Sequence, residues 1–141
     1  MTVGCIFCAI AAGESSSYQV AESDRALAFL DINPAAEGHT LVIPKAHADD
    51  IWDLDPEDGR EVWTLAQDVS TLLQERLRPD GMTLFQANGK FGWQHVFHFH
   101  LHVVPRWADD ALQKPWEITE GDPAQLTDVL ARLRDEPSAA S

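Results

Sequence analysis

The stretch His98-Phe99-His100-Leu101-His102-Val103-Val104 decides how this chain folds. From Val96 onward, apolar residues and histidines alternate at every second position. A period of two is typical of a β-strand, and the aromatic and β-branched residues favour one. The pattern therefore predicts a strand over 96–104. Its odd-numbered residues would be buried on one face, and three imidazoles would stand in a row on an open face.

Length and composition restrict the class of protein. The 141 residues fit one domain with a sizeable core, and no apolar run approaches the ~18 residues that a membrane span needs. The formal net charge is −13 without any cluster of Lys and Arg, which argues against a basic surface for nucleic acid or anionic membranes. The N-terminus lacks a signal-peptide pattern. We therefore expect a cytoplasmic protein with no nucleic-acid or membrane partner.

Hydrophobic periodicity and turn residues predict the other elements. The clearest helix follows a capping Asp55 and Pro56 and ends before Pro79. A last helix begins at Asp122-Pro123 and is expected to bury Leu126, Val129, Leu130 and Leu133. A short helix or turn is expected over 5–12, and the predicted strands are 18–22, 26–31, 39–43, 82–87 and 96–104.

The order of these elements does not alternate as it does in a doubly wound fold. We therefore expect an α+β fold, with a five-stranded antiparallel sheet and two main helices on one face. The prediction is a single domain over 1–134, followed by a disordered tail over 135–141. In this fold the long helix would cover the apolar face of the histidine strand.

Three histidines on one strand face suit nucleophilic chemistry better than a shared metal ion. Alternate residues on a strand lie roughly 6.6 Å apart, so His98 and His102 would be about 13 Å apart. Because Zn–N bonds are only ~2 Å, one ion can hardly be shared by all three. The middle imidazole, His100, can instead attack while its neighbours hold its tautomer or donate to a ligand. The alternative of merely tolerated polar residues is weakened by three consecutive face positions.

Several further blocks join the histidine stretch, and together they resemble one family. The sequence is similar to the histidine triad (HIT) family of nucleotide hydrolases and transferases over about residues 4–107. The matching blocks are Cys5-Ile6-Phe7-Cys8, Asp31-Ile32-Asn33-Pro34, Gly38 to Lys45, Gln94 to Phe97, His98 to Val104 and Pro105-Arg106. The resemblance implies a HIT-like fold and a homodimer.

The resemblance also implies a reaction at the α-phosphate of a purine nucleotide. His100 would form a covalent nucleotidyl-histidine that water hydrolyses, and His102 would bind phosphate oxygens or the leaving group. The implied catalytic residues are His100, His102, His98 and His39. The implied nucleotide-binding residues, besides His100 and His102, are Asp31, Ile32, Asn88 and Gln94. Phosphoramidates, adenylylated amines and dinucleoside polyphosphates are the candidate substrates.

Structural readings stay open for two of these residues. Asp31 also suits a turn at the end of its strand. Asn88 with Gly89 is a strong hairpin turn in its own right. For the whole protein, two alternatives to an enzyme remain: a nucleotide-binding or interaction protein with vestigial activity, and a zinc-binding module whose triad serves only metal.

Cys5 and Cys8 form a CxxC pair, which in a reducing compartment favours metal or redox chemistry over a structural disulfide. Two buried, reduced cysteines are the alternative. The resemblance implies a structural zinc ion held by these cysteines together with His47 and His98. Such a set would leave His100 unclaimed by metal.

The chain departs from the family pattern just before the triad. Trp93-Gln94-His95 stands where many members have Gly-Gln-Ser or Gly-Gln-Thr. His95 either replaces the hydroxyl residue that donates to the leaving group in one branch or points away from the site. The leaving-group preference therefore stays open.

Overall fold

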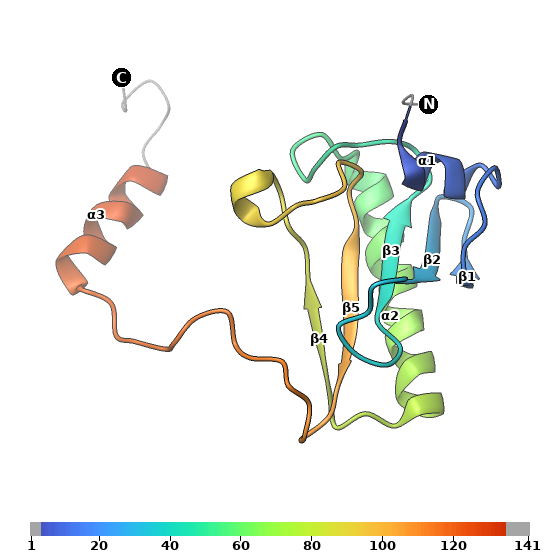
Figure 1. Ribbon diagram of the computed structural model, residues 1–141. Coiled ribbons are helices and arrows are strands. Elements are labelled where there is room, and N and C mark those ends of the chain that lie inside the picture. Colours follow the sequence, from blue (N-terminus) through green and yellow to red (C-terminus); the bar gives the residue numbers. More distant parts are fainter. Residues whose placement is uncertain (1–3, 135–141) are drawn as a thin grey trace. The chain divides into compact units, whose positions relative to one another are not determined.

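The structure, a computed structural model, describes residues 4–134, and the chain divides into two compact units, 1–111 and 112–141. The first unit holds a sheet in the order β1-β2-β3-β5-β4 with every neighbouring pair antiparallel (Figure 1). This confirms the predicted five-stranded antiparallel sheet of an α+β fold. The strands are β1 (Gln19–Glu22), β2 (Ala26–Leu30), β3 (Thr40–Pro44), β4 (Gly81–Phe85) and β5 (Leu101–Arg106).

Helix α2 (Pro56–Leu77) packs on one face of this sheet. Asp55 caps it as predicted: its carboxylate accepts a hydrogen bond of 2.8 Å from the N–H of Glu57, and Pro56 occupies the first turn. The buried apolar residues of α2 recur at helical spacing and meet the odd-numbered side of the histidine stretch. The core residues on the two sides are Val62, Leu65, Ala66, Val69 and Leu73 of α2 and Phe99, Leu101 and Val103.

The predicted strand over 96–104 is wrong in its first part, because β5 begins only at Leu101. The last β3–β5 pair toward this end joins Val42 to Leu101. Farther along β3, Pro44 has no N–H for the ladder, and its carbonyl accepts a hydrogen bond of 2.8 Å from the ring of His98. Phe97 is correspondingly exposed rather than buried. The triad therefore starts in a loop and ends in a strand.

Helix α1 (Ile6–Ala11) covers part of the opposite face of the sheet, so the histidine face is not open as expected. Phe7 of α1 lies edge-on to His100, with ring centroids 5.2 Å apart, and contacts His98 in the same way at 6.0 Å. Both histidines are buried. A short 3-10 helix, η1 (Lys90–Gly92), lies in the connection between β4 and β5.

The second unit contains helix α3 (Pro123–Arg134), which begins where the sequence predicts. Its leucines were expected to be buried, and this expectation is wrong: Leu126, Leu130 and Leu133 are exposed, and Val129 is only half-buried. The helix is amphipathic, but the described residues of its own unit provide no core against which that face can pack. The single domain over 1–134 stays a prediction, and the tail over 135–141 lies outside the described residues.

Among residues 4–134, no helix is both long enough and apolar enough to span a bilayer. The longest, α2, keeps charged residues along its exposed side.

Gly38 fixes the approach of the chain to His39 and provides a test of this packing. Its φ is +83°, and an added Cβ would lie 2.6 Å from Cδ1 of Leu77 and 3.2 Å from Cγ of Pro105. Gly13 has a similar φ of +77° with nothing within 4 Å of an added Cβ. We expect Gly13→Ala to cost about 1 kcal/mol, from backbone strain alone.

Gly38→Ala should lower the free energy of unfolding by about 1–3 kcal/mol more than Gly13→Ala, because it adds overpacking to the same strain. Urea denaturation of both variants measures the difference. Equal losses would show that the end of α2 yields freely at this contact.

Candidate active site

A cavity of about 730 Å³ lies beside the histidine stretch. It receives residues from α1, from the β2–β3 connection, from β4 and from the loop before β5. Five of the eight residues implied to be catalytic or nucleotide-binding line it: Asp31, Ile32, His39, His100 and His102. Three others do not line it: Asn88, Gln94 and His98.

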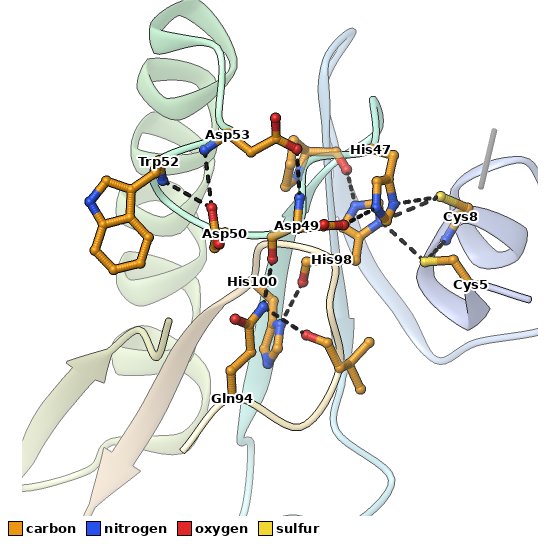
Figure 2. Close-up of polar contacts among 12 residues, drawn as sticks. Cys5, Cys8, His47, Asp49, Asp50, Trp52, Asp53, Gln94, His98 and His100 are labelled. Carbon is orange, nitrogen blue, oxygen red and sulfur yellow. Dashed lines mark hydrogen bonds and ion pairs between the residues drawn. The ribbon is translucent and has the colours of Figure 1, made fainter. Parts of the chain in front are cut away.

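The ring of His100 is held in one tautomer by the main chain. Its Nδ1 lies 2.8 Å from the carbonyl oxygen of His98, which can only accept, so Nδ1 carries the proton (Figure 2). Burial lowers the pKa of His100 below the ordinary value, only partly offset by this hydrogen bond and by the charge of Asp31. The imidazole is therefore neutral at pH 7, with its lone pair on Nε2.

A second chain of hydrogen bonds fixes His102. The N–H of Ala35 donates to Nδ1 of His39 at 3.0 Å, so the proton of His39 sits on Nε2. That Nε2–H donates to Nδ1 of His102 at 2.9 Å, which leaves His102 with a donor at its own Nε2. Burial and the neighbouring His100 and His39 lower the pKa of His102 to about 3. His102 is thus a neutral hydrogen-bond donor at the cavity.

Phe85 of β4 supports the same ring. It is the cross-strand partner of His102 in the β4–β5 ladder, and the two rings stack with centroids 4.1 Å apart and planes 7° apart. Sequence reasoning did not single out Phe85, because the contact appears only once the register of the two strands is known. The ring of His102 has little freedom, because Phe85 stacks on one side of it and its Nδ1 accepts a hydrogen bond from His39.

Asp31 combines the two readings that the sequence left open. Its Oδ1 accepts a hydrogen bond of 2.8 Å from the N–H of Asn33, which is the expected turn. Its Oδ2 lies 3.6 Å from Nε2 of His39, and the residue lines the cavity. Ile32, also at the cavity, is exposed.

Gln94 closes the loop that precedes the triad instead of reaching into the cavity. It is 3% exposed. Its Oε1 accepts from the N–H of Gly89 at 2.8 Å, and its Nε2 donates to the carbonyl of Val96 at 3.0 Å. The same Nε2 donates to the carbonyl of Asp49 at 2.6 Å (Figure 2). Every polar atom of the side chain is thus engaged. In this structure Gln94 acts on the site by fixing the loop.

Asn88 has a similar position. Its Oδ1 accepts a hydrogen bond of 2.7 Å from the N–H of Ile51, and its amide also bonds the side chain of Gln86. The predicted contact of Asn88 with a phosphate–ribose region has no counterpart at the cavity wall, because the amide faces the 50–53 segment. The hairpin turn that Asn88 and Gly89 suggest does not join the two strands either, because β4 ends at Phe85 and β5 begins only at Leu101.

Cys5, Cys8, His47 and His98 converge in a separate cluster (Figure 2), with ligand atoms all within 4.8 Å of one another. The Cys8 Sγ lies 3.2 Å from Nδ1 of His47 and 3.5 Å from Nδ1 of His98. These separations match the ~3.5 Å edge of a tetrahedron with Zn–S and Zn–N bonds of about 2.3 and 2.0 Å. The cluster is therefore compatible with zinc.

The outer nitrogens of both histidines are oriented for such a role. Nε2 of His47 bonds Oδ1 of Asp49 at 2.7 Å, and Nε2 of His98 bonds the carbonyl of Pro44 at 2.8 Å. Protons on these Nε2 atoms leave each Nδ1 lone pair directed at the sulfurs, as in metal-ligating histidines generally. His98 thus contributes its ring to this cluster and only its carbonyl to His100.

Comparisons with known proteins show which family the chain belongs to. The HIT domain family matches residues 12–109. The adenosine 5'-monophosphoramidase of Saccharomyces cerevisiae is 36% identical over 138 residues, which are 96% of this chain and 82% of that protein. Two crystal structures are similar: a HIT family protein from Bacillus anthracis, and a zinc-bound histidine triad family protein from Mycobacterium smegmatis.

The Bacillus structure has a TM-score of 0.86 and 34% identity, covering 94% of this chain and 96% of its own. The Mycobacterium structure has a TM-score of 0.74 and 37% identity, covering 92% of this chain and 95% of its own. With the triad, the sheet order and a family match over more than half of its length, the chain belongs to the histidine triad family.

Proposed function

We propose that this protein cleaves a purine nucleotide substrate at its α-phosphate through a covalent nucleotidyl-His100 intermediate. The observation that carries the proposal is the neutral imidazole of His100, whose Nδ1–H is bound by the His98 carbonyl while Nε2 keeps its lone pair. A neutral nitrogen with a fixed tautomer at a cavity is what nucleophilic catalysis by histidine requires.

The chemistry has two displacements at phosphorus. In the first, Nε2 of His100 attacks, the bond to the leaving group breaks, and the leaving group departs with the electron pair. A phosphate leaves as the anion, whereas an amine leaves from the form of the substrate whose nitrogen already carries the extra proton. The positive charge that develops on His100 is stabilised through its Nδ1–H bond to the His98 carbonyl. In the second, water attacks the phosphorus, the bond between phosphorus and Nε2 of His100 breaks with its electron pair returning to Nε2, and the attacking water loses a proton to solvent. The Nε2–H of His102 would donate to a phosphate oxygen in both steps.

The nucleoside would be held by the β2–β3 connection. Asp31 has one carboxylate oxygen used by Asn33, and the second is available to accept from ribose hydroxyls. The exposed side chain of Ile32 provides an apolar surface for a base. The activity named for the yeast relative, which acts on adenosine 5'-monophosphoramidate, supports a phosphoramidate among the substrates.

We also propose that Cys5, Cys8, His47 and His98 bind a structural zinc ion. The donor set, its separations and the zinc-bound relative from Mycobacterium smegmatis support this. Bound there, zinc would tie α1 to the residue whose carbonyl orients His100. Cytoplasmic location and a homodimer remain predictions that go with this function.

Replacing the nucleophile tests the mechanism. We expect His100→Ala to lower kcat for adenosine 5'-phosphoramidate on the order of 10⁴-fold or more, because no other group can form the covalent bond. Binding of AMP, measured by calorimetry, should persist. Wild type quenched during turnover should carry one nucleotidyl group. Undiminished turnover by the variant would reject the mechanism, and wild type that binds AMP without a trapped adduct would favour a vestigial binding protein.

The lowered pKa of His100 predicts an unusual pH profile. Only the neutral ring attacks, and a lowered pKa moves protonation below the ordinary value of 6.5. For diadenosine triphosphate, whose phosphates do not titrate in this range, kcat/KM at pH 6.5 should stay near its value at pH 8. A value of kcat/KM that has already fallen to half at pH 6.5 or above would contradict a buried, neutral nucleophile.

Metal analysis tests the cysteine cluster. Wild type should contain about one zinc ion per chain, and a chelator should lower its melting temperature. Cys8→Ser should lose the metal, melt at a lower temperature and no longer respond to the chelator. If wild type instead contains no metal and the chelator does not change its melting temperature, Cys5 and Cys8 contribute only to packing.

A further inference from the structure

Trp93 has a backbone conformation that its side chain disfavours. Its φ is +77° and its ψ is 19°, in the left-handed region where residues with a Cβ are strained. Its N–H donates to the carbonyl of Lys90 at 3.1 Å, so the turn is closed on itself. Glycine would adopt this turn without strain. The protein nevertheless has tryptophan, the bulkiest type of side chain, at this position.

Packing does not account for that choice. The Trp93 side chain is 68% exposed, so it buries little apolar surface in return for the strain. It does, however, line the same cavity as His100 and His102. A strained residue whose exposed indole faces a reaction cavity points to a ligand that covers it.

His95, on the other side of the clamped Gln94, faces the same cavity. Among the six histidines, all of which lie in the described part of the chain, His95 alone makes no hydrogen bond or ion pair with the protein. Its ring nitrogens therefore have no protein partner to give up when a ligand binds. An imidazole can donate a hydrogen bond in either protonation state.

Trp93 and His95 reach the cavity from the loop before β5, whereas Asp31 and Ile32, the residues proposed to hold the nucleoside, reach it from the β2–β3 connection. Val96, the residue after His95, packs against α1. Asp31, on the nucleoside side, lies next to His39, which is bonded to His102.

We propose that Trp93 and His95 form a subsite for a leaving group that joins a planar ring to a phosphate, as the second nucleotide of a dinucleoside polyphosphate does. This rests on the proposed function. The indole stacks on the ring of the leaving nucleotide, and His95 donates a hydrogen bond to its phosphate. When Nε2 of His100 attacks, the P–O bond breaks and the electron pair stays on the leaving phosphate oxygen. That anion needs no proton, so His95 only has to stabilise it.

The test compares two substrates that share the adenylyl group: diadenosine triphosphate, which releases ADP, and adenosine 5'-phosphoramidate, which releases ammonia. We expect Trp93→Gly to lower the ratio of their kcat/KM values about tenfold at the expense of the dinucleotide, mainly through KM, since a stack binds ground and transition state alike. His95→Ala should lower the ratio through kcat, and His95→Gln, which keeps an N–H donor, should partly restore it.

Phe91 supplies the matched control. It lies in η1 of the same loop and is 98% exposed, but it does not line the cavity. Phe91→Ala should leave the substrate ratio as in wild type. Trp93→Gly should also fold at least as stably as wild type, because glycine relieves the left-handed strain. A ratio unchanged by Trp93→Gly, or changed equally by Phe91→Ala, overturns the subsite.

Failure of the proposed function gives a different result. If wild type cleaves neither substrate, calorimetry still tests the subsite through the ratio of Kd for AMP to Kd for diadenosine triphosphate. Trp93→Gly should lower this ratio as well, because only the dinucleotide reaches the indole. An identical ratio in wild type and variant rejects the subsite whether or not the protein is an enzyme.

Discussion

The hydrogen bond between Nδ1 of His100 and the carbonyl of His98 is the constraint on which the site depends. It requires that residues 98–100 leave the regular ladder, since a carbonyl engaged with a neighbouring strand would point elsewhere. Pro44 provides that release, because it has no N–H to donate and its own carbonyl holds the ring of His98. The irregular start of the histidine stretch is therefore a condition for the tautomer of His100.

The same residue links two parts of the protein. The ring of His98 belongs to the cysteine cluster and its carbonyl binds the ring of His100, so α1, β3 and the triad meet at one position. The segment after β3 reinforces the link: the carbonyl of Ala48 accepts from the N–H of Phe99, and that of Asp49 accepts from Gln94. The cluster and the loop before β5 are thus fixed by consecutive peptide groups.

Much of this arrangement follows from local sequence patterns. The alternation of Phe99, Leu101 and Val103 predicts the face that packs under α2, and Asp55 with Pro56 predicts where that helix begins. The burial of the triad was not predictable in the same way, because it depends on Phe7, which is more than ninety positions away in the chain. Phe85 and the clamp made by Gln94 likewise depend on strand register and on a distant carbonyl. Local periodicity specifies which faces of an element are apolar, whereas long-range pairing decides what covers them.

The relay that ends at His102 begins at a main-chain amide, the N–H of Ala35. Every amino acid except proline supplies that group, so most substitutions at position 35 would leave the tautomers of His39 and His102 unchanged. The direction of the relay is set by the backbone at residue 35, between β2 and β3, and not by the side chain of that residue. Substitutions at position 35 other than proline therefore keep the same hydrogen-bond donor at the cavity.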